Sequence, residues 1–355
     1  MADSCFISYY NTINSCGDSA ENSFNAILNG CSGLAQPEDK IRQKYGVHIA
    51  GIINNRKRDD LAYGLIEELI INTQNSGIKN MPEMCIIASG FVGAGTGRLI
   101  NKDFLLRIKS RFPFIRNILI NTNACAAGNY AVNMACALIN SDVAGSVAVI
   151  GIDIVNEFVI AGFESMKNHA YNLSIPFSSN SEGMCVGEGA GILVVSKDRS
   201  ETVKYAEIAG TGFSSDPNGI TGMDKSGFGI ELCYERLTNS SGMIDRDTVI
   251  CSHGTGTRLN DRIESFFISE KFSNNPVVSL KGIIGHTLGG SAVIETALML
   301  EAMQKSVIPQ ADCPSPIDDR LKLVKKNTNV RINGFIKNSF GFGGVNSAVY
   351  YRRII

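Results

Sequence analysis

Apolar, strand-like segments alternate with helical segments along most of the chain, and this alternation restricts the fold more than any other feature. Val147 to Ile152 is an almost continuous apolar run, typical of a strand that is buried on both faces of a sheet. Leu61 to Gln74 and Gly289 to Met303 carry apolar residues at helical spacing. The other predicted strands are Phe6–Tyr10, Val47–Ile53, Met84–Ser89, Phe114–Ile120, Ile192–Ser196, Lys204–Gly212, Thr248–Ser252, Val277–Leu280, Gly334–Asn338 and Ser347–Tyr351. The alternation predicts an α/β protein in which helices cover the faces of the sheet.

The length and composition are those of a large globular protein. With 355 residues, of which 44% are hydrophobic, the chain can form one large domain or two fused halves. The predicted strands and helices divide near Ser200, which gives an N-terminal half over 1–200 and a C-terminal half over 201–355. No obvious sequence repeat relates the halves. The formal net charge of -1 does not indicate nucleic-acid binding as a property of the whole protein.

The cysteines and the amino terminus indicate a reducing compartment. The chain has 10 cysteines but no CxxC pair with zinc-site spacing, and its first residues lack the pattern of a secretory signal. We therefore expect a cytoplasmic protein. The run Asn117–Ser141 carries no charge, but its six asparagines make it unsuitable for crossing a membrane. No metal, nucleotide or flavin site is evident.

Cys125 stands where a strand gives way to a helix. The apolar segment Phe114–Ile120 precedes it, and small and apolar residues at helical spacing follow it. The thiol should face unpaired backbone N–H groups and the positive end of a helix dipole, both of which favour the thiolate. The alternative is a small buried cysteine without a chemical role.

Three further loops have the same format as the loop of Cys125: a strand end, then small residues around one distinctive side chain. These side chains are His253, His286 and Phe342. A cysteine and two histidines, each near a strand end, could converge on one site suited to nucleophilic catalysis. A purely structural role for each histidine stays open on this evidence.

Taken together, these motifs resemble those of an elongating β-ketoacyl-acyl carrier protein synthase, and the resemblance covers nearly the whole chain. The matching motifs are Ala124–Gly128, Gly187–Gly191, His253–Thr257 with Asn260, Asp261 and Glu264, Lys281–His286 with Glu295, and Asn338–Gly344 with Asn346. Their order makes the match specific, although no single motif would be. The resemblance implies a thiolase-like α/β fold, layered α-β-α-β-α, with two pseudo-duplicated halves.

The resemblance also implies a two-stage reaction. Cys125 would take an acyl group from the phosphopantetheine arm of an acyl carrier protein. A malonyl group on a second carrier would then lose carbon dioxide, and its enolate would attack the acyl-enzyme. His253 and His286 would donate hydrogen bonds to the developing enolate, and the backbone N–H groups of Cys125 and Phe342 would form the oxyanion hole. No cofactor is implied beyond the phosphopantetheine of the substrates.

The remaining roles follow from the same resemblance. Lys281 and Glu295 would form an ion pair that holds the histidines, and Asp261 would support the loop of His253. Thr255 and Thr257 would hydrogen-bond the pantetheine arm. The gating loop, which would separate the acyl pocket from the malonyl site, comprises Gly341, Phe342, Gly343 and Gly344.

The chain also departs from the family pattern. It is shorter than expected and passes quickly from Met166 to Pro176. Where the family has PFDxxRxGF, Ser178, Ser181 and Met184 replace the Asp, the Arg and the Phe. These changes affect the expected pocket shape, dimer surface and substrate length. The resemblance implies fatty-acid or specialised polyene or polyketide biosynthesis, and a trimmed member could serve a specialised pathway instead of housekeeping fatty-acid synthesis.

Partners and alternatives complete the expectations. Acyl carrier proteins are acidic, so we predict docking on the basic residues Lys102, Arg107, Lys109 and Arg111. A homodimer is expected, or a heterodimer with a related subunit in which this chain is the active half or a non-catalytic, chain-length-setting partner. A degradative thiolase would carry a second cysteine where this chain has Phe342, and an initiating ketosynthase would carry Asn in place of His286.

Overall fold

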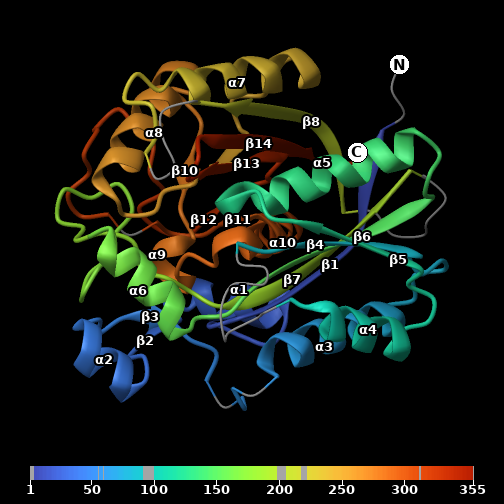
Figure 1. Cartoon of the computed structure of the whole chain (residues 1–355). Helices are drawn as coiled ribbons and strands as arrows, with labels where there is room; N and C mark the ends of the chain where they lie inside the picture. Colours follow the sequence, from blue (N-terminus) through green and yellow to red (C-terminus); the bar gives the residue numbers. More distant parts are fainter. Residues whose placement is uncertain are drawn as a thin grey trace.

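A computed structural model describes residues 4–54, 56–58, 60–90, 100–197, 205–216, 222–311 and 313–354. Its main feature is a mixed ten-stranded sheet with the order β10-β9-β13-β14-β8-β1-β7-β6-β4-β5 (Figure 1). The sheet consists of two half-sheets that are joined where Cys5–Ile7 of β1 pairs with Ala206–Ile208 of β8.

The two half-sheets have the same topology. The first contains β1 (Cys5–Asn14), β4 (Met84–Ala88), β5 (Asn117–Asn121), β6 (Ser146–Asp153) and β7 (Gly189–Ser196). The second contains β8 (Ala206–Ser215), β9 (Val249–Cys251), β10 (Val277–Val278), β13 (Gly334–Gly341) and β14 (Val345–Arg352). In each, the first strand pairs antiparallel with the fifth, the fifth antiparallel with the fourth, and the fourth, second and third run parallel. The predicted division at Ser200 lies outside the described residues, between β7 and β8.

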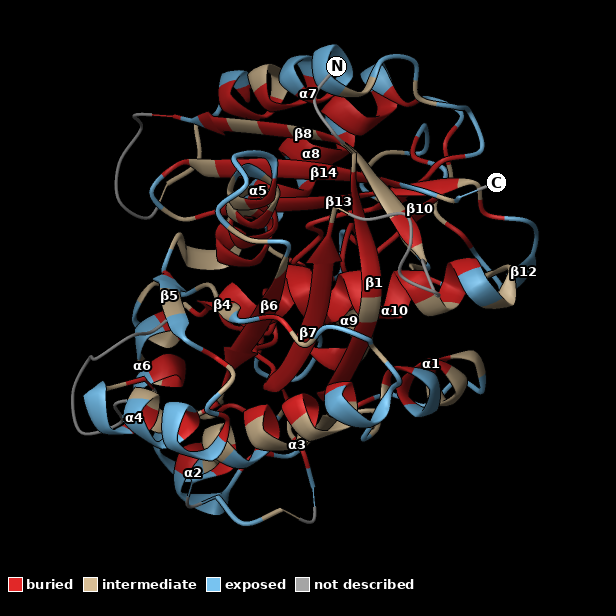
Figure 2. Cartoon of the chain, turned by 90° about the vertical axis from the view of Figure 1, so that its right-hand side faces the viewer, coloured by how far each residue is buried: buried red, intermediate tan, exposed pale blue. Residues whose placement is uncertain are grey.

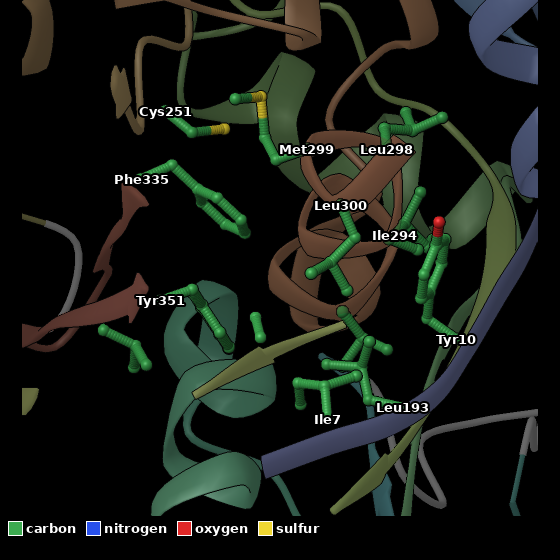
Figure 3. Close-up of a cluster of buried hydrophobic side chains, with 14 of the residues drawn as sticks. Ile7, Tyr10, Leu193, Cys251, Ile294, Leu298, Met299, Leu300, Phe335 and Tyr351 are labelled. Atoms are coloured by element: carbon green, nitrogen blue, oxygen red, sulfur yellow. The ribbon is translucent and has the colours of Figure 1, made fainter. Parts of the chain in front are cut away.

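Two helices fill the space between the half-sheets. They are α5 (Ala127–Asn140) and α10 (Ser291–Lys305), and almost every residue of α10 is buried. Figure 3 shows Cys251, Phe335 and Tyr351 of the second half-sheet beside α10, with Tyr10 and Leu193 of the first half-sheet on its other side. Because α10 packs against both sheets, its sequence is apolar around the whole helix instead of along one stripe.

Helices also cover the two outer faces. On one side, α3 (Leu61–Asn75) and α4 (Lys102–Arg111) pack on the first half-sheet; on the other, α7 (Phe228–Ser241) and α8 (Arg258–Lys271) cover the second. Figure 2 shows buried strands between helices whose outer surfaces are exposed. The arrangement is therefore α-β-α-β-α, which confirms the predicted layered α/β, thiolase-like fold with two duplicated halves.

The segment after the first helix differs from the prediction. Of the predicted strand Val47–Ile53, only Ala50–Gly51 forms a strand (β3), and it pairs with β2 (Leu34–Ala35) outside the main sheet. Val47 and Ala50 are buried against residues of α6 (Glu157–Ser165), so their apolar character reflects packing on a helix.

The remaining elements are α1 (Ala20–Leu28), α2 (Asp39–Tyr45), α9 (Lys281–Ile284), β11 (Val307–Ile308) and β12 (Thr328–Asn329).

Within the described ranges, none of the helices combines the length and the apolar character that crossing a bilayer requires.

Candidate active site

Residues from both halves line one cavity of about 490 Å³. Cys125, His253 and His286 all contribute to its wall, together with Thr255, Thr257 and Phe340–Phe342. Cys125 follows β5, His253 follows β9, and the segment that ends in His286 follows β10. The carboxyl ends of parallel strands are the usual place for binding sites in α/β proteins, and the structure brings the predicted cysteine and histidines together there.

A tight turn presents Cys125 to the cavity. The residue lies in a 3₁₀ turn, Ala124–Ala126, directly before α5, and Ala124 has a φ of 44°, a left-handed conformation that is rare outside glycine. Gly128 lets α5 approach α10, since a Cβ there would lie 2.8 Å from the Cβ of Ala292. The thiol lies beside its own backbone N–H and that of Phe342. These are the two groups predicted to form the oxyanion hole.

The resting thiol is neutral, contrary to the sequence-based expectation that its position favours the thiolate. Burial raises the pKa of Cys125 to about 12. The charge of Lys281 and the backbone N–H groups of Cys125 and Phe342 act in the opposite direction, but they do not overcome the loss of water. Cys125 therefore needs a proton acceptor when it attacks a substrate.

The two histidines are neutral and have free ring nitrogens. Their ring centroids are 5.2 Å apart, and both rings are buried. Burial, followed by the charge of Lys281, lowers the pKa of each well below its ordinary value. Within the described part of the chain, Nδ1 of His253 and both ring nitrogens of His286 have no hydrogen-bond partner. Buried polar atoms without partners are costly, so these nitrogens point to a ligand that supplies them.

Two buried carboxylates hold the loop of His253. Glu264 accepts hydrogen bonds from the backbone N–H groups of His253 and Gly254, both at 2.7 Å. Asp261 accepts from the N–H groups of Thr255 and Gly256, both at 3.0 Å. The loop therefore has little freedom to move.

A cluster of buried charges lies behind the histidines. Nζ of Lys281 is 2.6 Å from Oε1 of Glu295, so the predicted ion pair is present. Lys337, on β13, approaches the other carboxylate oxygen at 3.1 Å. Sequence reasoning did not find Lys337, although a lysine inside the apolar strand Gly334–Asn338 is a visible exception to the pattern.

The predicted gating loop forms the turn between β13 and β14. Gly343 and Gly344 have φ values of 79° and 71°, which disfavour other residues. The ring of Phe342 packs against Phe163 of α6, with centroids 5.9 Å apart. Gly341 lies so close to the nucleophile turn that a Cβ there would be 3.2 Å from the backbone nitrogen of Cys125.

The threonines and the altered segment also face the cavity. The hydroxyls of Thr255 and Thr257 lie 2.9 Å apart on its wall. Ser181 and Met184, which replace the Arg and the Phe of the family pattern, line it as well. Ser178 does not, and its hydroxyl accepts a hydrogen bond from the backbone of Asn180.

The basic residues of α4 do not line the cavity. Arg107 pairs with Asp60 at 3.0 Å, and Arg111 pairs with Glu67 at 2.8 Å. The other two, Lys102 and Lys109, are exposed. The cations that do line the cavity are Lys167 and Arg258, which have no ion-pair partner among the described residues.

Asp153 is a further buried group that sequence reasoning missed. It ends β6 and accepts hydrogen bonds from the hydroxyl of Ser89 at 2.8 Å and from the N–H groups of Gly90 and Gly290 at 2.9 and 3.0 Å. Burial raises its pKa to about 7. Asp153 thereby joins β4, β6 and the turn before α10, close to the loop of Cys125.

Comparison with known families matches two models. The beta-ketoacyl synthase N-terminal domain matches residues 116–200, and the beta-ketoacyl synthase C-terminal domain matches residues 205–312. A putative mitochondrial 3-oxoacyl-[acyl-carrier-protein] synthase of Schizosaccharomyces pombe is 30% identical, with 70% of this chain and 64% of the relative covered. The 3-oxoacyl-[acyl-carrier-protein] synthase 2 of Rhizobium meliloti is 31% identical, with 72% and 65% covered. The chain thus spans slightly less than two thirds of the length of these relatives.

Solved structures with the same fold include ketosynthases. One is a type II polyketide synthase acyl-carrier protein in complex with its ketosynthase, with a TM-score of 0.86, 19% identity and 100% of both chains covered. Another is the ishigamide ketosynthase/chain length factor, with a TM-score of 0.83, 20% identity and 100% of both chains covered. At these identities the likeness establishes the fold.

Proposed function

The chain belongs to the β-ketoacyl synthase family, and we propose that it is an active elongating 3-oxoacyl-[acyl-carrier-protein] synthase. One observation carries the proposal: Cys125 lines the same cavity as two neutral histidines, and Nδ1 of His253 and both ring nitrogens of His286 have no hydrogen-bond partner among the described residues. A nucleophile beside two neutral hydrogen-bond donors suits a reaction that forms first an acyl-enzyme and then an enolate.

The first step transfers the acyl group. Sγ of Cys125 attacks the thioester carbon of an acyl group on phosphopantetheine, and a neutral imidazole of the pair accepts the thiol proton. The N–H groups of Cys125 and Phe342 stabilise the oxyanion that forms on the carbonyl. The tetrahedral intermediate then releases the pantetheine thiolate, which takes up the proton and departs as a thiol.

The second step forms the carbon–carbon bond. The malonyl group loses its carboxylate as carbon dioxide, and the electron pair of that bond moves into an enolate. His253 and His286 donate hydrogen bonds to the enolate oxygen. The enolate carbon attacks the acyl-enzyme, the bond to Sγ of Cys125 breaks, and the thiolate takes up a proton. The product is a β-ketoacyl thioester on the second carrier.

The substrates bring the phosphopantetheine arm, so the proposed reaction needs no separate cofactor. Thr255 and Thr257, on the cavity wall, offer hydroxyls to the arm. Lys167 and Arg258 offer positive charge to an acidic carrier, whereas Arg107 and Arg111 form ion pairs with Asp60 and Glu67. The cytoplasmic location expected from the sequence belongs to this proposal.

A second subunit is also part of the proposal. β5 is the last strand of the sheet and pairs on one side only within the described part of the chain. A strand with an unpaired edge can accept a partner strand. The ishigamide ketosynthase is joined to a chain length factor, by its description. We therefore keep both a homodimer and a heterodimer in which this chain is the active half.

Intact-protein mass spectrometry tests the function. The chain is mixed with an acyl-loaded carrier protein, alongside Cys125→Ala and, as a matched control, Cys85→Ala, which removes a buried thiol of β4 outside the cavity. We expect a mass gain of one acyl group in the unmodified chain and in the control, and none in Cys125→Ala. An adduct that persists in Cys125→Ala would exclude the proposed nucleophile. No adduct at all would favour a non-catalytic subunit or a chain that needs its partner to load.

A further inference from the structure

Lys337 is fully buried, and no step of the proposed reaction uses it. Its side chain has 0% exposure, as has that of Glu295. Nζ of Lys337 lies 3.1 Å from Oε2 of Glu295, 2.5 Å from the carbonyl oxygen of Asn338 and 3.4 Å from that of Ser252. Lysines are almost never fully buried unless they are paired, because removing the ammonium group from water is costly. The position therefore calls for an explanation.

The contacts of Lys337 connect the segments that carry the two histidines. Ser252 directly precedes His253 at the end of β9, so the bond to its carbonyl fixes the start of the first histidine loop. Glu295, on α10, is shared with Lys281, which begins the segment that ends in His286. One carboxylate, held between two lysines, thereby joins both histidine segments.

We propose that Lys337 is a positioning residue for the condensation step. Its contacts with Ser252 and Glu295 fix His253 relative to His286. The inference rests on the proposed function: the enolate needs hydrogen bonds from both histidines at once, whereas acyl transfer needs one imidazole as a proton acceptor, so the relative position of the two rings matters most in condensation. Lys337 does not line the cavity, so it acts through these neighbours and not on the substrate.

The charge of Lys337 supports the same role. Lys281 and Lys337 carry two positive charges and Glu295 carries one negative charge, so the cluster has a net positive charge. Burial lowers the pKa of His253 and of His286 most, and the charge of Lys281 lowers both further. The charge of Lys337 also lowers both values, while the charge of Glu295 raises that of His286. Lys281, Cys251 and Glu264 also interact electrostatically with Lys337. The charged groups that act on the thiol of Cys125 are Lys281 and Asp153. We therefore expect Lys337 to affect decarboxylation more than acyl transfer.

The test separates the two half-reactions in the full chain. Lys337→Met removes the charge at similar volume, Lys337→Gln retains a hydrogen-bond donor, and Lys325→Met makes the same change at an exposed lysine as a control. Release of carbon dioxide from malonyl-pantetheine reports decarboxylation, and the mass gain on Cys125 reports acyl transfer. We expect decarboxylation to fall about tenfold to a hundredfold in Lys337→Met, with acyl transfer within about threefold of the unmodified chain.

Titration of the histidine ring nitrogens by ¹⁵N NMR gives a readout that does not depend on activity. Loss of the ammonium charge should raise the pKa of both His253 and His286, and Lys325→Met should leave both unchanged. Equal loss of the two half-reactions, or unchanged decarboxylation, would overturn the inference, as would failure of both Lys337 variants to fold. If the unmodified chain performs neither half-reaction, the proposed function fails, while the titration still decides whether Lys337 acts on the histidines.

Discussion

Three buried charged side chains lie behind the two histidines and act on their pKa. Glu295 accepts ion pairs from Lys281 and Lys337, and the hydroxyl of Ser291 donates a hydrogen bond to the same carboxylate. Burial alone would raise the pKa of Glu295, but the two lysines outweigh it and lower the value to about 2. The carboxylate thus keeps its charge in a place from which water is excluded, and both lysines depend on it.

Glu295→Gln should weaken folding strongly at neutral pH. The variant leaves two buried ammonium groups without a counter-ion, which costs about 3–5 kcal/mol. Urea unfolding at pH 7 measures this loss, and Glu235→Gln, an exposed change on α7, serves as the control. A variant as stable as the control would show that the cluster does not depend on the carboxylate.

The same carboxylate gives folding a pH dependence of defined sign. A group whose pKa is lower in the folded state stabilises folding above its unfolded value, here 4.5, and loses that contribution as the pH falls toward 2. The full shift corresponds to about 3 kcal/mol. The unmodified chain should therefore lose stability between pH 4.5 and pH 2 by about that much more than Glu295→Gln. Parallel stability curves for the two chains would contradict this assignment.

Some site residues could be predicted from short motifs, whereas others depend on contacts with residues far away in the sequence. Cys125, His253 and His286 each stand among small residues at a strand end, so local pattern was enough to select them. Lys337 has no such context, because its partner Glu295 comes from another element. The raised pKa of Cys125 is not visible in the local pattern either, since burial in the fold outweighs the nearby backbone N–H groups that lower it.

At the scale of elements, β5 combines an open edge with the approach to the nucleophile. It pairs with β4 on one side, and its residue Ile120 is 37% exposed. The strand leads directly into the turn of Cys125. A partner strand added at this edge would therefore stabilise the segment that positions the thiol.

Ile120→Lys should weaken self-association through β5. A lysine on an edge strand opposes pairing with another strand, because its charge would be buried in the new contact. We expect the unmodified chain to sediment as a dimer and Ile120→Lys to have a dimer dissociation constant at least about tenfold higher. Val143→Lys, which changes an exposed apolar residue outside β5, should not alter the dimer. If both variants dimerise equally, the interface lies elsewhere.

Strand prediction succeeded for the segments whose apolar residues lie in the main sheet. The strands of both half-sheets were expected from their composition, although β10 is shorter than Val277–Leu280 and β8 extends to Ser215. The segment Val47–Ile53 failed because its apolar residues pack on α6, and the sequence does not distinguish that environment from a sheet. No sequence repeat between the halves indicated the repeated topology, and only the family resemblance predicted it, since pairing order depends on backbone geometry and needs no shared residues.

For the whole molecule, the distribution of charge matters more than its sum. A formal net charge of -1 provides no long-range attraction for an acidic carrier protein. The cavity wall nevertheless carries Lys167, shortly after α6, and Arg258 at the start of α8. Under the proposed function, a carrier whose pantetheine arm enters this cavity would lie near these two cations.

Charge reversal distinguishes the cavity cations from the helix α4 as the carrier-docking surface. In Lys167→Glu/Arg258→Glu, the KM for acyl carrier protein substrates should rise about tenfold at low salt, because opposite charges accelerate encounter. Added salt should reduce the difference, since it screens exposed charges. Lys102→Glu/Lys109→Glu makes the same change on α4, where the lysines are exposed and outside the cavity.

A small acyl-cysteamine thioester, which needs no docking, should react at similar rates with both variants. A larger effect from the α4 variant would place docking on that helix, and an equal loss with carrier and small thioester would show that neither pair serves the carrier.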